Sequence, residues 1–401
     1  MSQKDYKKLI MVTGDNNNKF YEMIWEGGST FTVKYGRVEA TSTTITYPYS
    51  QWNKKYNEKV KKGYKDVTDY VSVEVVDNGK GGTNYAKISN NTVHEFVELM
   101  RQYRDNLVQA TYSVKAESVT QKQIDDAQSI IDDLNKLASV KQTAQVQETI
   151  KVYLLRLYGT IPRKMRNVKD HLPPNIKLVE VLDDEQDKLD AMASQVNANK
   201  PKGKNVKTAK EITILDEIGV TMTPCKEEKE IKYLTDQVAK LPNRASIKQI
   251  FRVDKPGENI TFEDWLKKQK NKETRILIHG TKCESVLPIL DIGLKIRPKG
   301  NFQFSGKVYG DGNYFSETMS KSLNYTGWGT DKVILVYEVH VGKPFVYDGW
   351  YRGNSFSLNY KELQSRGYDS TFVKAGGGLL NTEIIAYKEE QCRIKYVIWL
   401  K

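Results

Sequence analysis

The chain contains few of the residues that cross-link or metal-bound proteins depend on. Its 401 residues include three cysteines, Cys225, Cys283 and Cys392, and no two of them form a CxxC pair. This spacing excludes a disulfide framework and a zinc finger. Because there are only four histidines as well, we expect no structural metal site.

Long apolar runs are also absent. No segment approaches the roughly 20 apolar residues of a membrane helix, and the N-terminus MSQKDYKKLIMVTGDNN lacks the apolar core of a secretory signal. We therefore expect an intracellular protein that does not enter membranes. It would be nuclear in a eukaryotic cell, and cytoplasmic or nucleoid-associated if bacterial or viral.

Several common catalytic motifs are missing. The sequence has no Walker loop, no GxGxxG after a strand, no HExxH and no GxSxG. A glycine-rich segment, KAGGGLLN, lies between two strand-like runs, so it is only a weak candidate for a phosphate-binding loop. These absences argue against nucleotide hydrolysis, zinc peptidase and serine hydrolase chemistry.

Positive charge, by contrast, is abundant. The chain has 62 lysines and arginines against 50 acidic residues, a net charge of +12. Such a balance favours a polyanionic partner, usually nucleic acid. The length allows two or three domains, each with its own core.

The first part of the chain, residues 1–88, alternates apolar and polar residues as strands do. The alternating runs are YEMIWEGG, STFTVKYGRVEA, STTITYPYS and DYVSVEVV. Between the third and fourth runs, SQWNKKYNEKVKKGY has the periodicity of a helix, with Trp52 and Tyr56 on one face and lysines on the rest. We expect a compact α+β module with a basic helix.

Residues 90–268 switch to the helical period of about 3.6. Thr120 and Gln123 form a capping-box pattern, and Pro162 ends the third apolar stripe. We expect an all-α bundle with an exposed loop at 197–210. Strand-like runs return over 272–401, which predicts a mixed or antiparallel sheet domain, so the fold class is α+β multidomain.

His279 and Gly280 directly follow the strand-like run TRILI. A glycine there lets a ligand approach the backbone N–H and C=O groups closely. Taken alone, the pair reads more simply as a surface histidine before a turn.

The stretch GDGNYFSETMSKSLNYT begins with two glycines and contains Tyr314 and Tyr325. We expect Tyr314 on a short strand or turn, followed by a helix with Ser322 and Tyr325 one turn apart. Such a pair can offer a hydroxyl to a carboxamide and a ring to a planar heterocycle. Spacing alone favours a capped helix with core tyrosines.

Glu383 interrupts the apolar run LLNTEIIAY. A carboxylate in an apolar strand is costly unless it is paired or used in function. It is either a catalytic carboxylate in a cleft or an edge-strand charge, and alternation does not decide between them.

Together these features resemble one family. The segments LIHGTKCESVLPILDIGLKI, YGDGNYFSETMSKSLNYT and NTEIIAYKEEQCRIKYVIWL are similar, in that order, to the catalytic domain of poly(ADP-ribose) polymerases. His279, Tyr314 and Glu383 match the family's His-Tyr-Glu signature. Upstream, VTQKQIDDAQSIIDDLN and LRLYGTIPRKM resemble its helical regulatory domain, and KYGRVEA resembles the WGR motif of its DNA-binding module.

The resemblance implies roles for individual residues. The backbone of Gly280 and the hydroxyl of Ser322 would bind the nicotinamide carboxamide of NAD+. Tyr325 and Tyr314 would flank the nicotinamide ring, and His279 would contact the adenosine ribose. The remaining residues expected at the NAD+ site are Thr281, Ser285, Lys295, Lys321 and Glu383. Lys321 would lie beside Glu383, which would bind the nicotinamide ribose and polarise the acceptor; no metal is implied.

The WGR-like module carries the implied DNA contacts. Tyr35 stands where the family has tryptophan, followed by Gly36 and Arg37. The other expected DNA contacts are Lys54, Lys55, Lys59, Lys61 and Lys62, on the basic helix and just after it. The alternative for this cluster is a solvated lysine face.

The resemblance therefore implies an NAD-dependent poly-ADP-ribosyltransferase of the short type that depends on DNA. Its partners would be DNA with strand breaks, at 5′-phosphorylated ends or nicks, and protein acceptors including itself. It would be a monomer off DNA, autoinhibited by the helical domain. The alternatives are a mono-ADP-ribosyltransferase and a DNA-binding scaffold with a vestigial catalytic domain.

Overall fold

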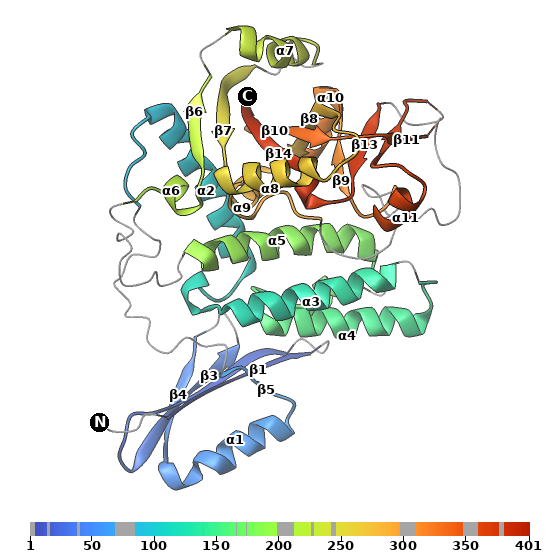
Figure 1. Ribbon diagram of the computed structural model, residues 1–401. Coiled ribbons are helices and arrows are strands. Elements are labelled where there is room, and N and C mark those ends of the chain that lie inside the picture. The colour runs from blue at the N-terminus through green and yellow to red at the C-terminus, as the bar shows by residue number, and fades with distance from the viewer. Residues whose placement is uncertain are drawn as a thin grey trace. The chain divides into compact units, whose positions relative to one another are not determined.

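The computed structural model describes residues 5–13, 17–37, 41–68, 85–138, 140–165, 167–173, 175–198, 212–225, 228–241, 246–296, 309–347, 360–376 and 381–401. The chain forms two compact units (Figure 1). The first contains residues 1–81 and 107–200, and the second contains residues 82–106 and 201–401.

The first unit begins with an antiparallel sheet of order β4-β3-β2-β1-β5. Its strands are β1 (Asp5–Thr13), β2 (Asn17–Trp25), β3 (Thr30–Arg37), β4 (Thr43–Pro48) and β5 (Lys65–Asp66). The helix α1 (Trp52–Lys61) covers one face, where Trp52 meets Phe31 with ring centroids 4.9 Å apart. The α+β module with a basic helix is thus present as expected, although the run DYVSVEVV lies outside the described residues.

Three long helices complete the first unit: α3 (Gln121–Ala138), α4 (Ala144–Thr160) and α5 (Leu178–Ala198). The predicted capping box is confirmed, because the Gln123 N–H donates to Thr120 Oγ1 and the Thr120 N–H donates to Gln123 Oε1. After α4 ends, a buried ion pair joins Arg163 to Glu185 on α5 at 2.5 Å. The carbonyl of Arg163 accepts from Asn18 of β2 at 3.2 Å, so helices and sheet share one polar contact.

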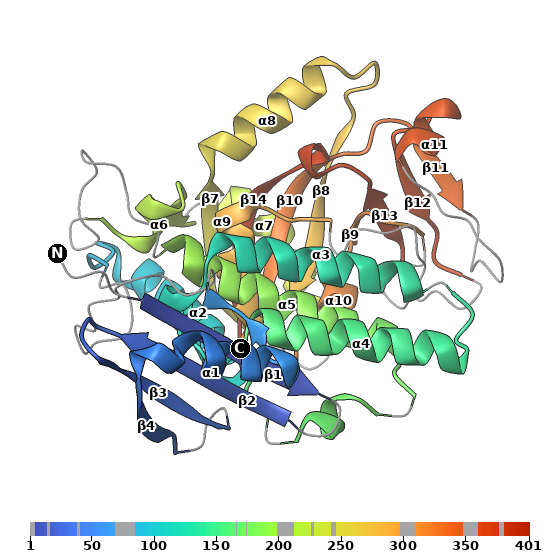
Figure 2. The same ribbon diagram turned by 90° about the horizontal axis from the view of Figure 1, so that it is seen from below.

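The second unit holds two sheets. The larger is antiparallel and has the order β6-β7-β14-β10-β8. Its strands are β6 (Thr221–Pro224), β7 (Ile247–Asp254), β8 (Thr274–Thr281), β10 (Lys332–His340) and β14 (Cys392–Leu400). Figure 2 shows β7, β14, β10 and β8 side by side.

The smaller sheet has the order β11-β12-β13-β9. Its strands are β9 (Asn313–Phe315), β11 (Pro344–Tyr347), β12 (Ser370–Val373) and β13 (Glu383–Ala386). β11 and β12 are parallel, and the other neighbours are antiparallel. The mixed or antiparallel sheet domain predicted from the strand-like runs is confirmed.

Short helices connect these strands. They are α6 (Ile214–Glu217), α7 (Glu228–Ala239), α8 (Pro256–Lys267), α9 (Cys283–Ile292), α10 (Met319–Ser322) and α11 (Tyr360–Ser365). Within the described residues, no helix is both long enough and apolar enough to span a membrane.

The expectation of helix alone between residues 90 and 268 is wrong. β6 and β7 lie in that range and join the larger sheet. The start of α2 (Asn91–Thr111) also belongs to the second unit, where Phe96 packs on Phe251 and Trp399 at 5.0 and 5.4 Å between centroids. Strands flanked by helices carry too little periodicity to stand out in the sequence. β7 pairs with β14 and β6 pairs with β7, and this pairing decides their conformation.

Candidate active site

The two sheets of the second unit meet where β8 reaches the end of β9. Ile278 and Ser316 exchange both backbone hydrogen bonds, each 2.9 Å long. One residue further along β8, the His279 ring lies 3.0 Å from the Tyr314 carbonyl, measured from Nδ1. The histidine and tyrosine of the predicted signature are therefore brought together from segments 35 residues apart.

The protonation of His279 follows from these contacts. Burial lowers the pKa of His279, which keeps the imidazole neutral near pH 7. A carbonyl oxygen can only accept a hydrogen bond. Nδ1 of His279 therefore carries the proton and donates a hydrogen bond to the Tyr314 carbonyl. Nε2 is left as an acceptor suited to a hydroxyl group.

Gly280 is required by a close approach of two backbones. A Cβ at this position would overlap the Ser322 carbonyl oxygen and lie 2.6 Å from its carbon. The hydroxyl of Ser322, a buried residue of α10, donates to the Ile278 carbonyl at 3.4 Å. Gly280 and Ser322 therefore lie in contact, as the binding of one carboxamide by both would need. Beside them, Thr281 is buried and pairs with Val333 of β10.

Tyr314 is held by the glycine turn that precedes it. Its hydroxyl donates to the Gly310 carbonyl at 2.8 Å and accepts from the Tyr309 N–H at 2.9 Å. The hydroxyl of Tyr387 donates to the Tyr309 carbonyl at 2.6 Å, so a second tyrosine fixes the same turn. Burial raises the pKa of Tyr314 well above its usual value, which leaves the phenol neutral.

Glu383 points into the protein, and its partner is Lys321. The two side chains form an ion pair, and only 12–13% of each is exposed. Glu383 is the first residue of β13, and Lys321 lies on α10. Of the two interpretations of Glu383, the edge-strand charge is excluded.

The environment of Lys321 also tunes its charge. Burial lowers the pKa of Lys321 to about 8, while the adjacent Glu383 carboxylate favours the charged ammonium. The pair is therefore sensitive to mildly alkaline pH.

Tyr325 lies at the end of the 3₁₀ turn Leu323–Tyr325 that continues α10, and about half of its side chain is exposed. Its ring is therefore open to a planar ligand. Tyr314, in contrast, packs beside the cluster of Tyr309, Val373 and Tyr387. The expectation that Tyr314 and Tyr325 flank one ligand ring stays a prediction.

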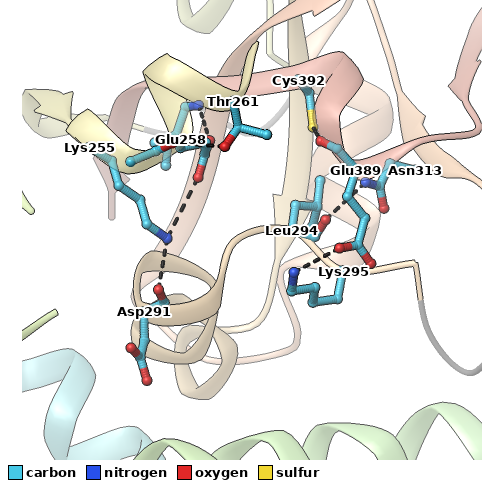
Figure 3. Close-up of polar contacts among 11 residues, drawn as sticks. Lys255, Glu258, Thr261, Asp291, Leu294, Lys295, Asn313, Glu389 and Cys392 are labelled. Carbon is cyan, nitrogen blue, oxygen red and sulfur yellow. Dashed lines mark hydrogen bonds and ion pairs between the residues drawn. The ribbon is translucent and has the colours of Figure 1, made fainter. Parts of the chain in front are cut away.

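Two other residues expected at the NAD+ site, Lys295 and Ser285, have protein partners. Lys295 forms an ion pair with Glu389 at 2.7 Å (Figure 3). The Ile296 N–H donates to the same carboxylate at 3.1 Å. Ser285 lies in the first turn of α9, and its N–H donates to the Lys282 carbonyl. No local pattern in the sequence points to Glu389, because its partner is 94 residues away.

The expected DNA contacts in the first unit have different exposures. Tyr35 is half-buried beside Tyr21, and Lys59 lies over the Tyr21 ring at 4.2 Å with its pKa lowered by burial. Lys55 lies 3.5 Å from Glu58. The expected contacts that are exposed are Arg37, Lys54, Lys61 and Lys62. Lys59 is thus a packing residue of the module, and the outer lysines form its open cationic surface.

Among the described residues, no group of three or more histidine, cysteine, aspartate or glutamate side chains is placed to hold a metal ion.

Comparisons with known proteins agree with this site. Residues 185–349 match the family described as poly(ADP-ribose) polymerase catalytic domain, a span that includes His279, Tyr314 and Lys321 and ends before Glu383. The chain is 53% identical over 173 residues to the poly [ADP-ribose] polymerase-like protein 100L of Invertebrate iridescent virus 6. That match covers 43% of this chain and 94% of the relative.

Two further relatives extend the comparison. The uncharacterized protein 101L of the same virus is 46% identical over 194 residues, which is 48% of this chain and 79% of that protein. Poly [ADP-ribose] polymerase 2 of Arabidopsis thaliana is 29% identical over 183 residues, covering 39% of this chain and 28% of that protein.

The contact between Gly280 and Ser322 predicts that a methyl group added at residue 280 destabilises the protein. Gly280→Ala should lower the free energy of unfolding by about 1–3 kcal/mol, because the methyl cannot be placed without moving α10. The matched control is Gly257→Ala on α8, where nothing lies within 4 Å of the added Cβ. Urea unfolding would measure both, and equal stability of the two variants would contradict the close contact.

Proposed function

The chain belongs to the poly(ADP-ribose) polymerase family and is an NAD+ ADP-ribosyltransferase, and we propose that it forms poly(ADP-ribose) in response to DNA strand breaks. The single observation that carries the proposed chemistry is the buried pair of Glu383 and Lys321 beside the His279-Gly280 corner. A buried carboxylate paired with a buried lysine has the character of a functional group.

NAD+ has a natural orientation in this site. The carboxamide of nicotinamide would bind the Gly280 backbone and the Ser322 hydroxyl, whose present bond to Ile278 is long and easily exchanged. The nicotinamide ring would stack on the exposed ring of Tyr325. The unprotonated Nε2 of His279 would accept a hydrogen bond from a ribose hydroxyl.

In the proposed reaction, the bond between ribose C1′ and the nicotinamide nitrogen breaks. Nicotinamide leaves with the bonding electron pair, and the positive charge passes to the ribosyl group. An acceptor oxygen then forms the new bond at C1′ and loses its proton. Glu383 would bind the ribose 2′-hydroxyl, stabilise the developing cation and polarise the acceptor, as carboxylates do at glycosidic centres.

We also propose that the enzyme elongates chains of ADP-ribose. In the family, glutamate at the position of Glu383 accompanies elongation, in which the acceptor is a ribose hydroxyl, and apolar residues accompany transfer of a single unit. Glu383 therefore favours polymer formation on protein acceptors, including the protein itself. Mono-ADP-ribosylation is the second candidate, and product length separates the two.

Activation by DNA rests on the first unit and on net charge. The chain carries +12 overall, and Arg37, Lys54, Lys61 and Lys62 are exposed on the module of β1–β5 and α1. Such a surface suits phosphates. We propose that a strand end or nick binds there and relieves an inhibition by the helices α3–α5, and that the protein is a monomer without DNA.

The activity itself is tested with NAD+ labelled in nicotinamide and in adenine, with and without a 5′-phosphorylated nicked duplex. We expect nicotinamide release that the duplex stimulates, with labelled chains on a gel. Glu383→Gln should reduce release at least about 100-fold, because it removes the charge facing the cation. A variant that keeps full chain-forming activity would overturn the role of Glu383, and a wild-type protein that releases no nicotinamide would favour a DNA-binding scaffold.

The ion pair between Lys321 and Glu383 predicts that turnover falls at alkaline pH. Lys321 is charged below its pKa of about 8 and loses its proton above it, so the Glu383 carboxylate loses its partner as pH rises. Turnover should therefore fall above about pH 8. Lys321→Arg keeps the positive charge, so the fall in turnover should occur at a higher pH. A fall at the same pH in that variant would contradict the assignment.

The cationic surface predicts a salt-dependent loss of DNA binding. Replacing Lys54, Lys61 and Lys62 by glutamine should weaken binding to a nicked duplex and reduce the slope of log K against log salt by about 2–3, since each phosphate contact contributes about 0.9. In the control variant, glutamine replaces three other exposed lysines, so the net charge changes by the same amount. These are Lys136, Lys232 and Lys267. Equal losses in both variants would show only a dependence on net charge.

A further inference from the structure

A polar network surrounds the corner between β9 and α10, outside the NAD+ contacts described above. Ser316, which is buried, holds the corner to β8 through its two backbone bonds with Ile278. Its hydroxyl accepts from the Thr318 N–H at 3.1 Å. The residue between them, Glu317, extends its carboxylate into a half-exposed position.

Two side-chain bonds link this corner to the residues that lead into Glu383. The Thr382 hydroxyl donates to Glu317 Oε2 at 3.2 Å, and Thr318 Oγ1 lies 3.4 Å from Asn381 Oδ1. Glu383 itself is the first residue of β13, paired with Val373. The approach to Glu383 is therefore fixed by side chains where the ladder of β13 begins.

Glu317 is itself held from the opposite side. Arg275 of β8 lies 3.5 Å from Glu317 Oε1 and donates to Glu273 at 3.0 and 3.2 Å. Both the arginine and Glu317 are more than a third exposed, at 37% and 40%. The attraction between them is therefore worth little in stability. What the arrangement provides is geometry, because one carboxylate oxygen is directed to Arg275 and the other to Thr382.

We propose that Glu317 is a positioning residue for the ADP-ribosyl transfer, acting through the Thr382 hydroxyl to hold Glu383 against Lys321. The proposal rests on the proposed role of Glu383. Lys321 belongs to α10, which starts two residues after Glu317, so one corner sets the position of both members of the ion pair. A catalytic carboxylate displaced by about 1 Å loses much of its effect, which gives such a corner a strong influence on rate.

The test uses the full chain and compares Thr382→Val, Thr382→Ser, Glu317→Ala and the double variant Thr382→Val with Glu317→Ala. Initial nicotinamide release is measured over a range of NAD+ concentrations. We expect Thr382→Val and Glu317→Ala each to lower kcat about tenfold while KM for NAD+ stays within about twofold. The double variant should be no slower than the slower single variant, because both changes break one link. Thr382→Ser keeps the hydroxyl and should restore most of the rate.

The control is Thr261→Val, which removes a hydroxyl bonded only to the Gly257 carbonyl on α8 and should keep the wild-type kcat. Thermal unfolding of every variant accompanies the kinetics, and a loss of kcat that tracks the melting temperature would overturn a specific role. Losses that multiply in the double variant would also overturn it. So would a change confined to KM for NAD+, which would make Glu317 an NAD+-binding group instead.

Failure of the proposed function has a different signature. If Glu383→Gln retains activity, Glu383 is not the catalytic carboxylate and the positioning role falls with it. If Glu383→Gln is inactive while Thr382→Val and Glu317→Ala match the wild type, only the positioning role is overturned.

Discussion

The close approach of Gly280 to the backbone of Ser322 is the contact on which the rest of the site depends. It places the end of β8 directly against α10, and no residue with a Cβ fits there without movement. This contact sets His279 and Gly280 beside Ser322, and α10 in turn carries Lys321 to Glu383. The absence of a Cβ at Gly280 thus brings the proposed carboxamide-binding residues close to the helix that carries the partner of Glu383.

Charge in the molecule is used in two ways. In the second unit, Glu383 is held inside the protein by an ion pair with Lys321, whose pKa is lowered by burial. In the first unit, Lys59 of α1 packs on the ring of Tyr21. Lys54, Lys61 and Lys62 remain exposed. Fewer cations are therefore available to a polyanion than the number of lysines in the sequence, because some lysines pack on tyrosine rings.

The sequence predicted much of the fold where a pattern is long and regular. The strands around YEMIWEGG, the helix with Trp52 and the capping box at Thr120 all appear where expected. β6 and β7 were missed, because a strand of a few residues is decided by the neighbour with which it pairs. His279 and Tyr314 of the predicted signature do meet, and Glu383 pairs with Lys321. The partners of Thr382 and Lys295, which are Glu317 and Glu389, lie 65 and 94 residues away and leave no local pattern.

The most direct test of the central claim is a crystal structure of the protein with nicotinamide bound. The account predicts the carboxamide on the Gly280 backbone and the Ser322 hydroxyl, the ring against Tyr325, and the Glu383–Lys321 pair intact on the ribose side. Nicotinamide bound elsewhere in the second unit, or a Glu383 side chain turned away from the ring, would contradict it.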